Sequence, residues 1–396
     1  MAAKVYLRRL TPVLLKEIKL PGITVLTGMR QVGKTTLLRQ IYDTLETKHK
    51  IFLDMENPLN QKIFEEENFD NITANLGAFG FSAGKQSFIF LDEIQVAPEI
   101  IKAIKYLYDH YKIKFFLTGS SSFYLKNLFP ESLAGRKINY ELFPLDFEEF
   151  LIFKTKKKKF YESFSLKAEN KNKVSYLIYS KLLDEYLEFG GFPAVVLEAN
   201  WERKREILKD IFTSYFEKDV RTLADFHGLG KLRDLILLLT SRAGSKLDIS
   251  KISSELGISR ETVYSHLSFL EKTYFIFLVS PFSRNTDGEV KGAKKIYFCD
   301  NGLLNYLGKL SEGAVFENSV FLNLKKYGKL NYYQKYKGPK IDFILNENTG
   351  FEVKITPTIS DSNRLNRLAD TLKLKESYLL TKSLSEQPNV VLAQDL

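Results

Sequence analysis

The chain has 396 residues, of which 44% are hydrophobic and 13% aromatic, so it holds material for two or three packed domains and is not a largely disordered protein. Its single cysteine, Cys299, excludes an internal disulfide and a multi-cysteine zinc site. No apolar run reaches the ~20 residues of a membrane span, and Met1–Lys19 is charged where a signal peptide is apolar. We therefore expect a soluble cytoplasmic protein without a membrane partner.

The net charge of +10 is concentrated in the later part of the chain. Residues 1–150 hold 19 Lys and Arg against 18 Asp and Glu, whereas residues 151–396 hold 39 against 30. A basic surface attracts polyanions such as DNA, but lysine also serves solubility. The charge pattern leaves both interpretations open.

Short apolar runs alternate with amphipathic stretches in the first 150 residues. This alternation predicts a parallel sheet with helices on both faces, because parallel strands are buried on both sides. The predicted strands are residues 23–26, 51–53, 87–91 and 114–118, and the predicted helices are residues 35–45 and 100–111.

A glycine-rich segment lies between the first predicted strand and the first predicted helix. It reads Gly28-Met29-Arg30-Gln31-Val32-Gly33-Lys34-Thr35 and fits the pattern G-x-x-x-x-G-K-[ST]. Backbone N–H groups of such a loop, together with the helix N-terminus, bind phosphate oxygens. We expect Lys34 to reach the β- and γ-phosphates of ATP, Thr35 to bind Mg²⁺, and Thr36 to continue the nucleotide-binding segment.

Polar side chains end the next two predicted strands. Asp92 and Glu93 follow a buried run, where Asp92 is expected to hold Mg²⁺ and Glu93 to deprotonate the attacking water. Thr118 and Ser120 end the fourth strand, where they are either γ-phosphate sensors or an ordinary turn.

Together these segments resemble AAA-type ATPases of the archaeal and prokaryotic P-loop group. The resemblance extends to Leu133–Arg136, Leu142–Leu145 and Gly190–Pro193. It implies that Arg136 is a sensor or arginine finger, acting in cis or across a subunit boundary, and that Pro193 lies near adenine. The alternatives are a surface salt bridge for Arg136 and an interhelical turn for Pro193. Proteins of this group carry a helical lid, a winged helix and a nuclease-like domain.

Residues 248–282 have the pattern of a helix-turn-helix followed by a strand. Asp248 and Ser259 are expected to cap the two helices, and Val263, Leu267 and Leu270 share one face. The opposite face of the second helix carries candidate DNA contacts, namely Arg260, Thr262, Tyr264 and Ser265. A packing or partner-docking role is the alternative, because the helix is poor in basic residues.

Three strands are predicted near the C-terminus, at residues 331–334, 340–345 and 351–355, and the last two form a hairpin. Asp342 and Glu352 would meet around one Mg²⁺, Glu317 would add a carboxylate, and Lys354 would orient a water molecule. The alternative is a hairpin with a solvent-facing Glu–Lys pair.

The order Asp342, then Glu352-Val353-Lys354, resembles the PD-(D/E)XK nuclease superfamily, with a helix at residues 363–374 and a strand at 378–380 completing its core. In that family a proline usually precedes the aspartate directly, whereas here Lys340 and Ile341 separate Pro339 from Asp342.

The predicted organisation has four parts. They are an ATPase core at 1–153, a helical lid at 154–228, a winged helix at 229–285 and a restriction-endonuclease-like α/β domain at 286–396. Two functions remain open. One is an ATPase whose nucleotide state controls a DNA-directed nucleolytic module, and the other is an ATP-driven protein-interaction switch with an inactive docking domain. The sequence does not decide whether the protein forms homo-oligomers.

Overall fold

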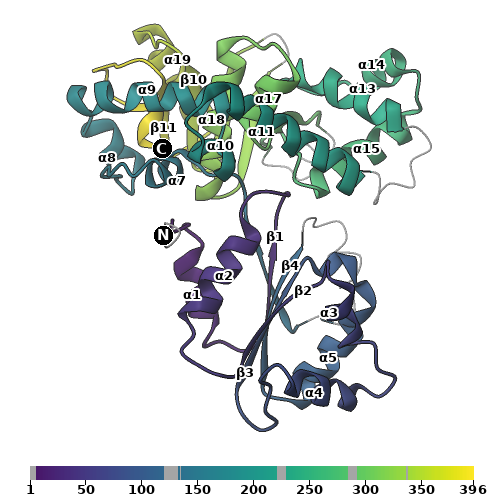
Figure 1. The fold of residues 1–396 in the computed structure, drawn as a ribbon. Helices are drawn as coiled ribbons and strands as arrows, with labels where there is room; N and C mark the ends of the chain where they lie inside the picture. The colour runs from purple at the N-terminus through teal and green to yellow at the C-terminus, as the bar shows by residue number, and fades with distance from the viewer. Residues whose placement is uncertain (1–5, 120–132, 134, 221–228, 284–291, 336–337) are drawn as a thin grey trace. The chain divides into compact units, whose positions relative to one another are not determined.

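The protein is represented by a computed structural model that describes residues 6–119, 133, 135–220, 229–283, 292–335 and 338–396 (Figure 1). The chain divides into two compact units. The first contains residues 1–143, to which 214–225 and 272–274 are added, and the second contains 144–213, 226–271 and 275–396. Each unit is described by itself.

A five-stranded parallel sheet forms the centre of the first unit, in the order β2-β3-β4-β1-β5. Its strands are β1 (Ile23–Thr27), β2 (Lys50–Asp54), β3 (Ser87–Asp92), β4 (Ile113–Gly119) and β5 (Lys137–Glu141). Every residue of β1 and β4 is buried, as expected for strands covered on both faces. The predicted α/β class with a parallel sheet is confirmed for this unit.

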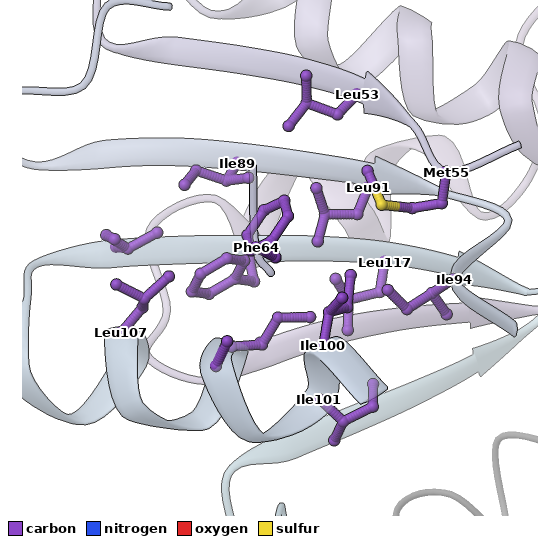
Figure 2. Packing of buried hydrophobic residues seen from close by; sticks show 14 of the residues in the cluster. Leu53, Met55, Phe64, Ile89, Leu91, Ile94, Ile100, Ile101, Leu107 and Leu117 are labelled. Atoms are coloured by element: carbon purple, nitrogen blue, oxygen red, sulfur yellow. The ribbon is translucent and has the colours of Figure 1, made fainter. Parts of the chain in front are cut away.

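Helices cover both faces of this sheet (Figure 1). They are α1 (Thr11–Glu17), α2 (Lys34–Thr44), α3 (Pro58–Lys62), α4 (Phe69–Gly77) and α5 (Ile101–His110). Aliphatic and aromatic side chains from the strands pack against those of α4 and α5 (Figure 2). This core fixes the strand ends and therefore the loops that follow them.

The strand β5 was not among the predicted strands. Its side chains are exposed or half-buried, because it lies at the edge of the sheet beside β1. An edge strand with polar residues lacks the continuous apolar run that indicates a buried strand. The four predicted strands and two predicted helices of this unit are confirmed, with ends shifted by one or two residues.

Helices dominate the first part of the second unit. They are α7 (Phe147–Phe153), α8 (Phe164–Glu169), α9 (Lys173–Phe189), α10 (Pro193–Leu197) and α11 (Trp201–Ser214). Residues 154–163, which include five lysines, connect α7 to α8 without forming a helix or a strand. Lys158 nevertheless has a nearly buried side chain and forms an ion pair with Asp395 at 2.7 Å.

The predicted helix-turn-helix corresponds to α14 (Ile249–Leu256) and α15 (Arg260–Lys272), which α13 (Leu229–Thr240) precedes. Asp248 accepts a hydrogen bond from Lys251 N and Ser259 from Thr262 N, so both predicted caps are confirmed. The buried face of α15 includes the three predicted apolar residues, and Tyr264 is 59% exposed. An antiparallel pair, β6 (Ile276–Val279) and β7 (Lys295–Phe298), follows.

A second five-stranded sheet ends the chain, in the order β12-β11-β10-β9-β8. Its strands are β8 (Leu330–Gln334), β9 (Lys340–Leu345), β10 (Thr349–Lys354), β11 (Glu376–Thr381) and β12 (Val390–Leu392). Two helices, α17 (Asn301–Leu307) and α18 (Glu312–Leu324), precede it, and α19 (Ile359–Thr371) connects β10 to β11. The pairs β8–β9 and β9–β10 are antiparallel and the others parallel. The predicted strands and hairpin are confirmed.

None of the helices in the described ranges has the length and apolar character to span a bilayer.

Candidate functional sites

The phosphate loop connects the end of β1 to the start of α2. Gly33 adopts a left-handed conformation, with φ 95°, immediately before Lys34 opens the helix. A Cβ atom on Gly28 would lie 2.1 Å from the carbonyl oxygen of Leu142, so only glycine fits there. Met29 and Val32 are buried, whereas Gln31 and Thr36 are exposed. The loop therefore offers its backbone, and not these apolar side chains, to a ligand.

Lys34 is held inside this loop. Its side chain is buried, and Nζ donates to the carbonyl oxygens of Gly28 at 3.1 Å and Met29 at 3.0 Å. Burial lowers the pKa of Lys34, while the negative charges of Glu93 and Asp219 oppose that shift. An ammonium group held by neutral carbonyls in a buried loop has a strong electrostatic preference for an anion.

Asp92 and Thr118 lie side by side at the carboxyl ends of β3 and β4. The Thr118 hydroxyl donates a hydrogen bond to Asp92 Oδ1 and accepts one from the Glu93 backbone N–H at 2.9 Å. Burial raises the pKa of Asp92, and hydrogen bonds from Thr118 and Thr35 counteract this. Thr35, Asp92 and Thr118 therefore form one connected group beside Lys34. A hydroxyl next to a buried carboxylate is a donor set that fits Mg²⁺.

Glu93 follows Asp92 and has a left-handed backbone conformation, with φ 56°. Such a conformation is uncommon for a residue with a side chain and is concentrated at functional sites. Its carboxylate accepts a hydrogen bond from the Gln95 side chain. Glu93 is the residue between the end of β3 and a short 3-10 helix at Ile94–Val96.

Ser120, the other predicted γ-phosphate sensor, lies outside the described residues.

Two residues at this site were missed by sequence reasoning because they come from distant segments. Asp219, in the π-helical turn Tyr215–Val220, forms an ion pair with Arg30 of the loop at 3.0 Å. The Tyr274 hydroxyl lies 2.7 Å from Thr27 Oγ1 and donates to Glu141 at 3.0 Å. No local sequence pattern indicates either residue, because each reaches the site through a contact between segments that are far apart in the sequence.

Arg136 lies at the end of the sheet opposite to the phosphate loop. It precedes β5, whose first residue, Lys137, is in register with Ile23 at the start of β1. The phosphate loop follows the other end of β1, and Arg136 instead pairs with Asp109 at 2.7 Å. The expectation that Arg136 acts in cis therefore does not fit this placement. Action across a subunit boundary stays a prediction.

Pro193 opens α10 in the second unit, after two glycines with a clear packing role. A Cβ on Gly191 would lie 2.1 Å from the carbonyl oxygen of Leu145, and its backbone N–H donates to Asp300 at 2.6 Å. The close approach of Gly191 to the Leu145 backbone therefore explains a glycine at this position on structural grounds. The adenine contact of Pro193 stays a prediction.

The predicted C-terminal carboxylates occupy neighbouring strands. Asp342 and Glu352 are fully buried on β9 and β10, and Asp342 Oδ2 accepts a hydrogen bond from Val353 N at 3.0 Å. Because Phe343 pairs with Phe351, the next pair along this register brings Asp342 opposite Glu352 on the same face. The solvent-facing Glu–Lys alternative is wrong for Glu352, which is 1% exposed.

Cations accompany each of these carboxylates. Lys340 lies 2.8 Å from Asp342, and Lys295 lies 3.6 Å from Asp342 and 3.0 Å from Glu317. Burial alone would raise the pKa of Asp342, but the two lysines outweigh it and hold the pKa below its usual value. Lys354 and Arg364 both contact Glu352.

These contacts give the predicted C-terminal metal site a partial fit. Glu352 Oε2 is buried and, within the described part of the chain, has no hydrogen-bond partner, which suits a cation. Glu317 joins the cluster through Lys295 and the Tyr297 hydroxyl. Across the described ranges, however, no three His, Cys, Asp or Glu side chains are grouped closely enough to hold a metal ion.

Three family models match the chain in succession. Residues 21–151 match an AAA domain, residues 180–314 a domain of unknown function (DUF8612), and residues 312–392 another domain of unknown function (DUF4143). The AAA match contains the loop, Asp92, Glu93 and Thr118.

Related chains share most of this length. The uncharacterized protein MJ1544 of Methanocaldococcus jannaschii is 32% identical over 365 residues, covering 88% of this chain and 78% of that protein. An uncharacterized protein of Haemophilus influenzae is 28% identical over 337 residues, covering 81% and 79%. A Walker-type ATPase of Pyrococcus abyssi is similar in structure with a TM-score of 0.49 and 16% identity, covering 76% of this chain and 96% of that one. The chain therefore belongs to the same protein family as MJ1544, and its residues 21–151 form a P-loop ATPase-like AAA domain.

Proposed function

We propose that the protein binds ATP with Mg²⁺ at the phosphate loop and hydrolyses it. The observation that carries this proposal is the connected group of Thr35, Asp92 and Thr118 beside the buried Lys34. These residues come from three separate segments, and a chance glycine turn has no reason to bring a hydroxyl, a buried carboxylate and an ammonium group together.

Each residue has a defined role in this proposal. Lys34 exchanges its two carbonyl partners for phosphate oxygens, which are stronger acceptors because they are charged. Thr35 and Asp92 hold Mg²⁺, which neutralises negative charge on the phosphates. Glu93, fixed at the strand end, accepts a proton from the attacking water. Thr118 holds the Asp92 carboxylate and the Glu93 backbone in place.

Two substitutions test the proposal. Lys34→Ala is expected to abolish ATP binding, because the loop loses its buried cation. Glu93→Gln is expected to bind ATP but lose hydrolysis by roughly 10²–10⁴-fold, the usual contribution of a general base. Binding is measured by calorimetry with Mg²⁺ and hydrolysis by phosphate release. Native protein that gives no heat with ATP would end the proposal, and unchanged turnover in Glu93→Gln would end the role of Glu93.

We further propose that the nucleotide state controls a DNA-directed, nucleolytic C-terminal module. The buried pair Asp342 and Glu352 supports this. Removing two neighbouring carboxylates from water costs free energy, which a bound metal ion would offset. Lys354 lies 3.1 Å from Glu352 and is half-buried, so it can orient a water molecule there. A bound Mg²⁺ would supply Lewis-acid activation to the phosphodiester. The competing function is a protein-interaction switch in which Lys295 and Lys340 permanently neutralise Asp342 and the module only docks a partner.

A further inference from the structure

The ion pair between Arg30 and Asp219 places a carboxylate beside the phosphate loop. Arg30 is the third residue of the loop, and its Nε lies 3.0 Å from Asp219 Oδ2. The Asp219 side chain is 4% exposed and that of Arg30 is 16% exposed. Because water is largely excluded, the charge of Asp219 acts at close range with little screening.

The charges around Lys34 show what this carboxylate does to the site. The charged groups that act most strongly on Lys34 include the cation Arg30 and the carboxylates of Glu93, Asp219 and Asp92. Asp92 and Glu93 have roles in holding Mg²⁺ and activating water. Asp219 has no such role in the proposed reaction, yet its negative charge opposes the entry of phosphates.

The segment that carries Asp219 is held firmly in this position. Asp219 lies in a π-helical turn, Tyr215–Val220, which continues directly from α11. The Tyr215 hydroxyl is buried and lies 2.7 Å from Thr273 Oγ1. π-Helical turns are rare in proteins and occur frequently at functional sites. The turn therefore presents Asp219 to Arg30 on an anchored support.

We infer that Asp219 is an affinity-setting residue, an internal anion that holds Arg30 until the phosphates of a nucleotide displace it. This inference rests on the proposed ATP-binding function and adds that the Asp219 carboxylate competes with the nucleotide phosphates for Arg30. Arg30 has one guanidinium, and a polyphosphate carries more charge than a carboxylate, so the phosphates win the exchange. Part of the free energy of nucleotide binding is then used to break the ion pair. Nucleotide binding thereby changes a contact of the turn Tyr215–Val220, which follows α11.

The test is the isosteric substitution Asp219→Asn, with affinities for ADP and ATP measured by calorimetry without divalent metal. We expect the variant to bind ATP roughly tenfold more tightly than native protein, and ADP with a smaller gain, because the removed repulsion scales with phosphate charge. In an Arg30→Gln background the gain from Asp219→Asn should shrink, since there is no guanidinium left to compete for.

The matched control is Asp43→Asn, which removes the same charge from an exposed position at the far end of α2. Asp219→Ser serves as a second neutral variant if Asp219→Asn does not fold. Weaker binding of both nucleotides in a folded variant would mean that Asp219 only supports the loop and would overturn the inference. An equal gain for ADP and ATP, or a gain that persists in Arg30→Gln, would also overturn it. In each of these cases ATP binding by native protein leaves the proposed function standing.

Discussion

Gly28 shows how a single residue determines the nucleotide site. Its α-carbon lies so close to the backbone of Leu142 that a methyl group would overlap the carbonyl oxygen, at 2.1 Å. The nearest atoms belong to the Leu142 backbone and not to the end of a flexible side chain, so a small side-chain movement cannot remove the overlap. The motif glycine therefore serves the packing of the sheet edge as well as the approach of phosphate.

We expect Gly28→Ala to destabilise the ATPase unit by roughly 2–4 kcal/mol, the upper range for a substitution that creates backbone strain. The measurement is urea unfolding of the full chain. Gly77→Ala is the matched control, because nothing lies within 4 Å of its Cβ position at the end of α4. If the two variants prove equally stable, the close approach at Gly28 is not present in the molecule.

At the scale of an element, the N-terminus of α19 is held by a reciprocal cap. Thr358 accepts a hydrogen bond from Asp361 N, and the Asp361 carboxylate accepts one from Thr358 N, forming a capping box. Burial alone would raise the pKa of Asp361, but hydrogen bonds from Thr358 and the charge of Lys354 outweigh this and lower it to about 2. The helix predicted at residues 363–374 began four residues too late and ended three residues too late, because this cap was not considered.

The capping box gives α19 a stability that depends on pH. Asp361→Asn is expected to cost roughly 1 kcal/mol at neutral pH. Because the folded pKa of Asp361 lies below the unfolded value near 3.8, this contribution is complete above about pH 4 and is lost as the pH falls toward 2. Urea unfolding at several pH values measures the difference between the two proteins. Asp370→Asn, exposed on the same helix, is the control and should show no such pH dependence. A difference that stays constant down to pH 2 would contradict the assignment.

At the scale of the whole molecule, the second unit combines basic charge with a buried pair of carboxylates. The basic excess lies after residue 150, and the buried Asp342 and Glu352 lie in the same part of the chain. A nuclease and an inert docking domain use this arrangement differently. In a nuclease the carboxylates must exchange lysine partners for a metal, whereas in a docking domain the ion pairs persist.

Supercoiled plasmid separates these two functions. With Mg²⁺ or Mn²⁺ we expect nicking by native protein and none by Asp342→Ala or Lys354→Ala. Glu347→Gln, an exposed carboxylate in the β9–β10 turn, should nick like native protein. DNA affinity is measured in parallel and should fall with increasing salt, because phosphate contacts release counterions. Absence of both nicking and salt-sensitive binding would leave the interaction switch as the remaining function.

The sequence by itself predicted the elements that a strong local pattern marks. Apolar runs indicated the strands β1 to β4 and the hairpin of β9 and β10, and caps indicated α14 and α15. The phosphate loop was recognisable because its function needs glycines, a lysine and a hydroxyl at fixed spacing. The edge strand β5 was not, since it needs no continuous apolar run.

Only the tertiary structure decided which residues surround that loop. It placed Arg136 at the opposite end of the strands from the phosphate loop, and it brought Asp219 and Tyr274 to the loop from segments far along the chain. It also gave Asp342 its lysine partners, Lys295 and Lys340. The physical reason is that an ion pair or hydrogen bond depends on distance in space, and the chain's folding sets that distance without leaving a periodic pattern in the neighbouring residues.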